Sequence, residues 1–304
     1  MTLSSKIKHF ALTSRPYSYA SEILLGIVFY DLVNQGKLEP LTIALVSTLS
    51  VMMWTFFNWQ SDWIQKDKGR FVPNPLLCYS PLIISILIAI NLNGYYGILG
   101  IAAYVATILL YSRKKDSPAL GIVSSLLRGL TVIGHFTMIY LISTDHTLNF
   151  KVFLISLVFV LYKVLSNLLG DLRDIENDKN ELPARYGFRI TLIVLRLIYL
   201  AILVILFILQ NGSIELIASF ALFILFCIFF ESLSYKVKSD EESSKLGYIS
   251  HRLINFFLTV TLIVLFYFQT GMIWLSINFS LLYLIGQLTY NYNPGKKYKH
   301  LVAN

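Results

Sequence analysis

The sequence predicts an all-α integral membrane protein, and three observations lead to this prediction. Hydrophobic residues make up 56% of the 304-residue chain and charged residues only 14%, which is far from the composition of soluble domains. Apolar runs of about 17 to 25 residues, long enough for a helix to cross a bilayer, recur along the whole chain. Lys and Arg residues are grouped between these runs. Because a bilayer offers backbone groups no hydrogen-bond partners, helices are the expected spanning elements.

Ten spans are predicted from apolar runs that end at polar or turn-forming residues. Turns at Asn93–Gly94, Asn211–Gly212 and Thr270–Gly271 are expected to join neighbouring spans into hairpins. Nine spans remain an alternative if one segment is re-entrant or interfacial. The expected bundle therefore has nine to ten transmembrane helices. The predicted spans are residues 18–36, 40–60, 75–93, 95–112, 118–143, 150–170, 189–210, 213–234, 251–269 and 272–291.

The distribution of positive charge predicts the orientation in the membrane. Of the 25 Lys and Arg residues, 20 fall on one side of the ten-span arrangement, two on the other (Lys37 and Lys151) and three inside spans. The positive-inside rule places the 20 in the cytoplasm, together with both termini. Topology thus explains the net charge of +8, and we expect no nucleic-acid partner. The N-terminal stretch lacks the features of a cleavable signal peptide, so we expect it to be retained.

An acidic stripe follows directly after the predicted span over residues 150–170. Asp171, Asp174 and Asp178 follow one another at spacings of three and four, which would place them on one helical face. Continuing this stripe backwards adds Asn167 and Lys163. Neighbouring carboxylates repel one another, and oxygen ligands suit Mg²⁺, which commonly joins carboxylates to a substrate phosphate.

A second polar cluster lies at the end of the predicted span over residues 40–60. Asn58 and Asp62 lie one helical turn apart, with Asp67 just beyond. Two such clusters on the same side of the membrane would be able to hold Mg²⁺ ions that bridge a diphosphate. The alternative is that both are ordinary solvated loops, because basic residues are interleaved with the acidic ones. These basic residues are Lys66, Lys68, Arg70, Arg173 and Lys179.

The two clusters resemble the aspartate-rich motifs of the UbiA superfamily of intramembrane prenyltransferases. Asn58, Asp62 and Asp67 are similar to the first motif, and DLRDIENDK at residues 171–179 is similar to the second. One departure concerns the first motif, because the family usually has its last aspartate where this chain has Lys66. On a continuous helix Asp67 would face away from Asp62, so the helix must end or bulge for Asp67 to join the site.

Further features extend the resemblance over nearly the whole chain. Tyr111–Lys115 is similar to the Tyr-x-x-x-Lys element that the family uses near the diphosphate. Arg15–Pro16 and Leu182–Gly187 also resemble family features. The link from Asp178 to Leu182 is shorter than in quinone-pathway members, which weakens any transfer of their substrate choice. The resemblance implies a single UbiA-like domain over residues 1–304, with a central cavity open to the cytoplasmic side.

The resemblance implies that Mg²⁺ assists ionisation of an allylic prenyl diphosphate, with basic side chains countering the charge of the leaving pyrophosphate. Water must be excluded from the resulting carbocation. The expected metal ligands are Asn58, Asp62, Asp67, Asp171, Asp174 and Asp178. The expected catalytic residues are Asp62, Asp171, Asp174, Lys115 and Glu22. The residues expected to bind substrate are Asn58, Arg15, Tyr111, Lys115, Lys163, Asn167, Arg128, Arg173 and Lys179.

Ionisable residues within predicted spans are costly and therefore prompt functional hypotheses. Glu22 is the preferred candidate for a general base or acceptor-binding group. Arg128 and Arg196 have the alternative of structural ion pairs, and His135 that of a satisfied core residue. Residues 234–250 are mixed in charge and rich in serine. They are interpreted as a solvated cytoplasmic linker.

The function expected from these observations is Mg²⁺-dependent transfer of a prenyl group from an allylic diphosphate to a lipophilic acceptor, aromatic or lipid, with release of pyrophosphate. The expected location is the plasma membrane, with the active site facing the cytoplasm. One alternative is a UbiA-type terpene cyclase that needs no external acceptor. Another is a cation-coupled transporter, although its sites are expected near the membrane midplane rather than at one face.

Overall fold

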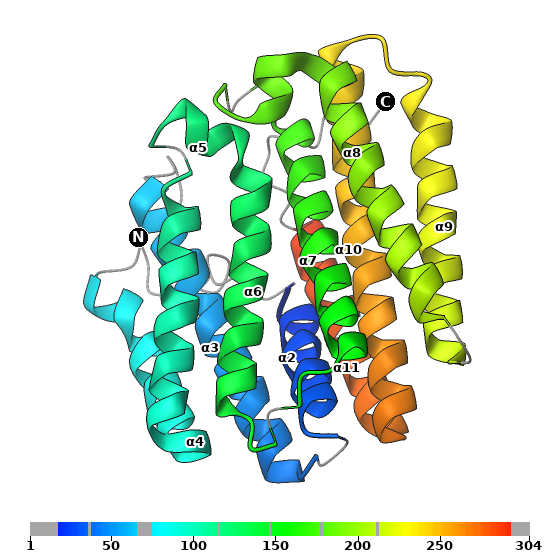
Figure 1. Ribbon diagram of the computed structural model, residues 1–304. Helices are drawn as coiled ribbons and strands as arrows, with labels where there is room; N and C mark the ends of the chain where they lie inside the picture. The colour runs from blue at the N-terminus through cyan, green and yellow to red at the C-terminus, as the bar shows by residue number, and fades with distance from the viewer. Residues whose placement is uncertain are drawn as a thin grey trace. The chain divides into compact units, whose positions relative to one another are not determined.

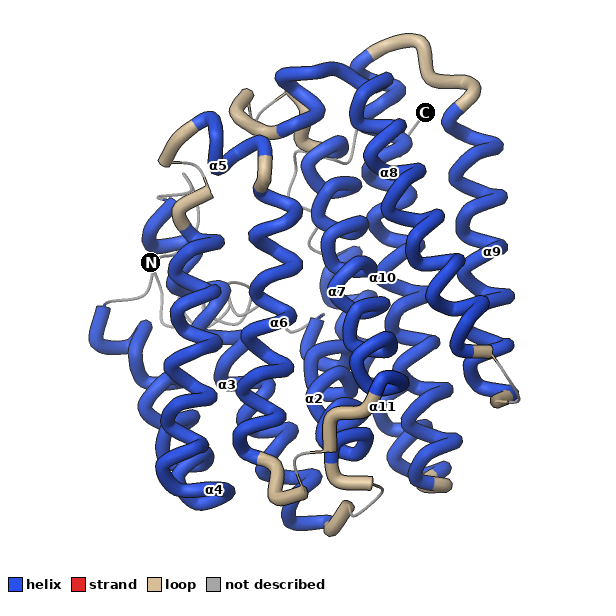
Figure 2. Tube along the Cα trace, in the orientation of Figure 1, coloured by secondary structure: helices blue, strands red, loops and turns tan. Residues whose placement is uncertain are grey.

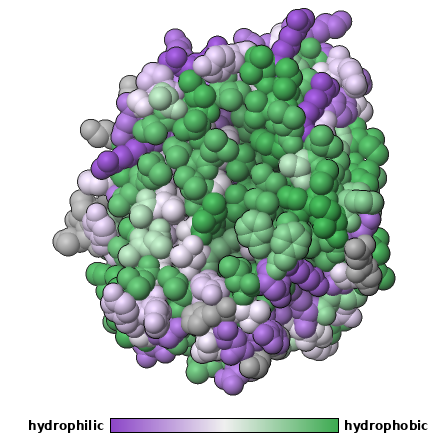
Figure 3. All heavy atoms as spheres, in the orientation of Figure 1, coloured by the Kyte–Doolittle hydropathy of each residue, from purple (hydrophilic) through white to green (hydrophobic). Residues whose placement is uncertain are grey.

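The computed structural model describes residues 18–35, 38–65, 75–114, 116–145, 147–176, 179–210 and 213–292. The regular secondary structure in these ranges is helical (Figures 1 and 2), and they contain no strand. Seven helices are long and apolar enough to cross a membrane, and hydrophobic residues dominate the face shown in Figure 3. These findings confirm the prediction of an all-α integral membrane protein, while nine to ten crossings stay a prediction.

The described chain divides into two compact units. The first combines residues up to Arg113 with 133–148 and 266–293. In it, α3 packs against α2 and α4, and α11 packs against α2. The helices of this unit, with the last ten residues of α6 (Ser124–Ile142), are α2 (Tyr19–Val33), α3 (Pro40–Gln65), α4 (Pro75–Ser112) and α11 (Ile273–Tyr292).

A sharp turn divides α4 into two arms. Asn93 and Gly94 leave helical geometry, and Gly94 has a φ of 47°, which favours glycine because it lacks Cβ. A Cβ added to Gly97 would lie 2.1 Å from the carbonyl oxygen of Ala89, so the second arm folds back beside the first. The Asn93 side chain donates hydrogen bonds of 2.9 and 3.0 Å to two carbonyl oxygens at the end of α6. The predicted turn is thereby confirmed.

The second unit comprises residues 114–132 and 149–265 of the described chain. In it, α8 packs against α7, α9 and α5, and Figure 1 shows α7 to α10 running alongside one another. Besides the start of α6, its helices are α5 (Pro118–Ile122), α7 (Phe150–Arg173), α8 (Leu182–Leu209), α9 (Ile214–Ser234) and α10 (Asp240–Thr270) as far as Leu265.

Aromatic side chains pack α7 against α9 within the second unit. The ring of Tyr162 meets that of Phe223 edge-on at 5.0 Å, and Phe226 and Phe230 continue the series along α9. All four side chains are buried. Since lipid tails are as apolar as the helices, close packing of this kind holds membrane helices together.

The predicted span over residues 118–143 is confirmed only as α6 (Ser124–Ile142), because a separate short helix, α5, forms its first residues. Pro118 begins α5, whose N-cap Ser117 accepts a hydrogen bond from the Leu120 N–H at 3.3 Å. This short helix ends at Ile122, and α6 begins at Ser124. Proline is favoured at the first position of a helix, where its missing N–H costs nothing.

The prediction of a solvated linker over residues 234–250 is also wrong, because α10 begins at Asp240. A capping interaction starts the helix: Ser239 Oγ accepts a hydrogen bond from the Glu242 N–H at 3.2 Å. Gly247 of α10 lies against α7, and a Cβ added there would be 2.5 Å from the backbone nitrogen of Arg173. The first turns of α10 are therefore packed against the acidic end of α7.

Candidate functional site

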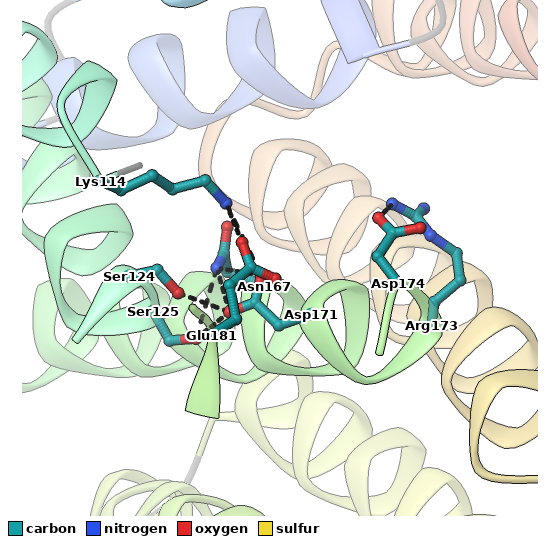
Figure 4. Close-up of polar contacts among 8 residues, drawn as sticks. All are labelled: Lys114, Ser124, Ser125, Asn167, Asp171, Arg173, Asp174 and Glu181. Carbon is teal, nitrogen blue, oxygen red and sulfur yellow. Dashed lines mark hydrogen bonds and ion pairs between the residues drawn. The ribbon is translucent and has the colours of Figure 1, made fainter. Parts of the chain in front are cut away.

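The acidic stripe stands where α7 ends. Asn167 and Asp171 lie one turn apart on the helix, and Asn167 donates hydrogen bonds of 3.1 Å to both Asp171 oxygens. Asp174 is the C-cap residue. It pairs with Arg173 at 2.7 Å, apart from the contacts of Asp171 (Figure 4). Asp178 lies outside the described residues.

Hydrogen-bond donors from the start of α6 hold Asp171 in place. Its Oδ2 accepts from Ser124 Oγ at 2.6 Å and from Ser125 Oγ at 3.2 Å. Only 5% of Asp171 is exposed. A buried carboxylate needs such donors, since the loss of hydration would otherwise disfavour its charged form. Together with Asn167, these donors fix the orientation of the carboxylate.

A lysine lies between Asp171 and a second buried carboxylate. Lys114 Nζ is 2.7 Å from Glu181 Oε1 and 3.7 Å from Asp171 Oδ1, as Figure 4 shows. Lys114 is 8% exposed and Glu181 is 3% exposed. We call Asp171, Lys114 and Glu181 the charge triad. Burying three charges is tolerated only when opposite charges and hydrogen bonds compensate the loss of hydration.

Four residues of this arrangement were not among the predicted site residues: Lys114, Ser124, Ser125 and Glu181. Lys114 lies within the predicted Tyr111–Lys115 element, while Lys115 itself falls outside the described residues. Glu181 directly precedes Leu182 and Pro183, and only this position next to a family feature hinted at a role.

The charge triad suits a hard divalent cation by its donor chemistry. Asp171, Glu181 and Asn167 offer oxygen atoms as potential ligands, and the two carboxylates outweigh the single positive charge of Lys114. In the part of the chain that the structure describes, no group of three or more His, Cys, Asp or Glu residues forms a metal cage. Mg²⁺ needs no such cage, because it keeps several waters and takes one or two carboxylates together with substrate phosphates.

The first acidic cluster lies in the other unit, on α3. This helix continues to Gln65, so Asn58 and Asp62 share one face as predicted. Both are buried, and Asn58 donates a hydrogen bond of 2.9 Å to the Trp54 carbonyl oxygen. Its own Oδ1 is buried and accepts no hydrogen bond within the described structure. An acceptor kept in this state is costly unless something binds it. Asp67 lies outside the described residues.

The end of α4 meets the same stretch of α3. The Tyr111 ring lies 5.4 Å from the ring of Phe57, the residue before Asn58. Ser112 Oγ and Ser61 Oγ are 2.9 Å apart. Tyr111 thus stands beside the residue that precedes Asn58, at the first acidic cluster. Arg15 falls outside the described residues.

The remaining predicted residues are placed as follows. Arg196 makes two hydrogen bonds to Glu231, of 3.0 and 2.7 Å, which confirms its interpretation as a structural ion pair. Arg128 donates to Thr131 Oγ1 at 2.8 Å. Glu22 and Lys163 are buried in α2 and α7 respectively, His135 is buried in α6 with its ring stacked on Tyr104, and Lys179 is exposed.

Comparison with known proteins relates the chain to solved structures rather than to sequences. Neither the protein-family models nor the sequences of curated proteins gave a match. A digeranylgeranylglyceryl phosphate synthase superposes with a TM-score of 0.60 at 18% identity, over 85% of this chain and 99% of the other.

Two UbiA homologues give similar results. The homologue from Archaeoglobus fulgidus bound to GPP and Mg²⁺ has a TM-score of 0.57 at 13% identity, over 84% of this chain and 99% of that one. The homologue from Aeropyrum pernix K1 has a TM-score of 0.57 at 16% identity, over 84% and 98%. This chain therefore shares its fold with these solved UbiA homologues.

Proposed function

We propose that this protein is a Mg²⁺-dependent intramembrane prenyltransferase of the UbiA type. It would move a prenyl group from an allylic prenyl diphosphate to a lipophilic acceptor, aromatic or lipid, and release pyrophosphate. The observation that carries the proposal is Asp171, a buried carboxylate on the largely apolar helix α7 that accepts hydrogen bonds from Ser124, Ser125 and Asn167. An ionisable group placed at such cost in a membrane helix favours a functional role.

The bound ligands of a structural neighbour support the choice of substrate class. A UbiA homologue from Archaeoglobus fulgidus has been solved with GPP and Mg²⁺, and also with DMAPP and Mg²⁺. Both compounds are allylic diphosphates. Bound Mg²⁺ would supply positive charge to the diphosphate oxygens as the leaving group departs.

The side chains divide the work between binding and catalysis. Asp171, Asp174 and Asp178 would hold the cation at the end of α7, and Asn58, Asp62 and Asp67 would do so at the end of α3. The buried Oδ1 of Asn58, which accepts no hydrogen bond within the described structure, supports its inclusion. Basic and polar groups would bind the diphosphate or orient the cation ligands. These are Arg15, Tyr111, Lys115, Arg128, Lys163, Asn167, Arg173 and Lys179.

Glu22 would serve as the general base or as a contact for the acceptor. It is buried in α2, and an ionisable group within a membrane helix favours a functional role. We also propose that the protein lies in the plasma membrane. Its active site would face the cytoplasm, because the positive-inside rule assigns the charged loops to that side.

A product assay tests the proposal. Purified protein in detergent is incubated with Mg²⁺ and allylic diphosphates of increasing chain length, with and without a lipid extract, and the lipids are then separated. The proposal predicts a prenylated product that needs both the diphosphate and the extract. A cyclic hydrocarbon or alcohol formed from the diphosphate alone would instead identify a terpene cyclase, and no consumption of any diphosphate by folded protein would contradict both.

A further inference from the structure

We propose that Glu181 sets the divalent-cation affinity of the candidate site by holding the Lys114 ammonium group away from Asp171. This inference rests on the proposed function, since it concerns the cation at Asp171. Glu181 is a positioning residue in this account, because it acts through Lys114. The observation that carries the proposal is that Lys114 Nζ lies closer to Glu181 Oε1, at 2.7 Å, than to Asp171 Oδ1, at 3.7 Å.

The backbone places Glu181 where it reaches Lys114. Glu181 is the N-cap residue of α8, with extended backbone angles, yet its side chain makes no capping hydrogen bond. Acidic N-cap residues usually accept a hydrogen bond from the first turn of the helix. Here the carboxylate is directed at Lys114 instead, as Figure 4 shows.

The two partners are also held by close backbone packing. A Cβ added to Gly121 of α5 would lie 2.5 Å from the carbonyl oxygen of Asn180, the residue before Glu181. Lys114 stands four residues before Pro118, which begins α5. Because α5 touches the segment that carries Glu181, this packing keeps the chain on either side of the ion pair close together.

The charges explain why this arrangement would favour a cation. Two carboxylates and one ammonium group give the charge triad a formal charge of −1. Coulomb attraction falls with distance, so the Lys114 ammonium group interacts more strongly with Glu181 than with Asp171. The negative charge of Asp171 is therefore less fully compensated by Lys114 than that of Glu181, and it remains available to attract a metal ion. With a neutral side chain at position 181, Lys114 would move closer to Asp171 and compete directly with that ion.

The binding of Mn²⁺ tests this proposal without any prenyl diphosphate. Mn²⁺ accepts the same oxygen ligands as Mg²⁺, and its free form is measured by electron paramagnetic resonance. The Glu181→Gln variant is expected to bind Mn²⁺ about tenfold more weakly than the unchanged protein. The variant Lys114→Gln is expected to bind at least as tightly as the unchanged protein. The double variant, with the formal charge back at −1, is expected to recover binding to within about threefold.

A matched control is available on α10. Glu241 pairs with Lys245 at 3.0 Å near the first turn of this helix, where Glu241 is largely exposed. The Glu241→Gln variant removes the same charge from a lysine–glutamate pair outside the charge triad. It is expected to bind Mn²⁺ like the unchanged protein.

The outcomes separate this inference from the proposed function. If Asp171→Asn, in folded protein, leaves Mn²⁺ binding unchanged, Asp171 is not a cation ligand, and both this inference and the role of Asp171 in the proposed function fail. If Asp171→Asn abolishes binding while Glu181→Gln leaves it intact, only the role of Glu181 is overturned. Should Glu181→Gln fail to fold, the double variant decides, because binding far weaker than that of Lys114→Gln and of the unchanged protein would contradict the proposal.

Discussion

Ser124 Oγ donates a hydrogen bond of 2.6 Å to Asp171 Oδ2, whereas the neighbouring Ser125 Oγ lies 3.2 Å from the same oxygen. Hydrogen bonds to a charged group stabilise a protein by about 1.5 to 3 kcal/mol, and shorter ones of this kind are stronger. The start of α6 therefore holds the carboxylate mainly through Ser124.

Replacing Ser124 by alanine should destabilise the protein more than replacing Ser125. We expect Ser124→Ala to lower the free energy of unfolding by about 1 to 3 kcal/mol, because Asp171 loses its shortest hydrogen bond. Ser125→Ala is expected to lower it by about 1 kcal/mol or less. Thermal unfolding in detergent measures both. Equal effects of the two substitutions would contradict this account.

Removing the buried amide of Asn58 should separate stability from activity. Its Oδ1 accepts no hydrogen bond within the described structure, so the Asn58→Leu variant, which keeps the branched shape of the side chain, is expected to unfold at the same temperature or higher. Its rate of pyrophosphate release is expected to fall about 100-fold, because a proposed ligand is lost. A destabilised variant with full activity would show that Asn58 serves the fold alone.

A methyl group at position 247 should force α10 away from α7. The added Cβ of Gly247→Ala would meet the Arg173 backbone nitrogen at 2.5 Å, and overpacking of this kind costs about 1 to 3 kcal/mol. The matched control is Gly170→Ala, whose Cβ would meet the His251 ring at 3.4 Å, an ordinary contact. Melting temperatures should fall for the first variant and change little for the second. The reverse order would contradict the packing described above.

The ion pair between Arg196 and Glu231 should stabilise the fold without serving the site. We expect Arg196→Met and Glu231→Gln each to cost about 1 to 2 kcal/mol, below the range for fully buried pairs because both side chains are partly exposed. Since the two residues contact each other, their effects should not add in the double variant. Additive losses, or a change in Mn²⁺ affinity, would argue against this assignment.

Local patterns in the sequence predicted much of this structure. The apolar runs predicted the helices, Asn93–Gly94 predicted the turn in α4, and spacing predicted the shared faces of Asn58 with Asp62 and of Asn167 with Asp171. Each of these relationships joins residues close in sequence, where helical geometry alone decides which side chains meet.

Contacts between segments that are distant in the chain could not be predicted from the sequence. Lys114 and Glu181 are 67 residues apart, and no local spacing indicates that they pair. The early start of α10 did carry a signal, because Ser239 is followed three residues later by Glu242, the pattern of a capping box. The mixed charge of that segment led to its interpretation as a linker, although acidic residues are favourable in the first turn of a helix.

The most direct test of the central claim is the Mg²⁺-dependent release of pyrophosphate from an allylic diphosphate by the unchanged protein and by Asp171→Asn. Asp240→Asn serves as the control, because it removes an exposed carboxylate from the start of α10. The account predicts release that requires Mg²⁺, falls about 100-fold or more in Asp171→Asn and is unchanged in Asp240→Asn. Equal release by folded Asp171→Asn and the unchanged protein would contradict it.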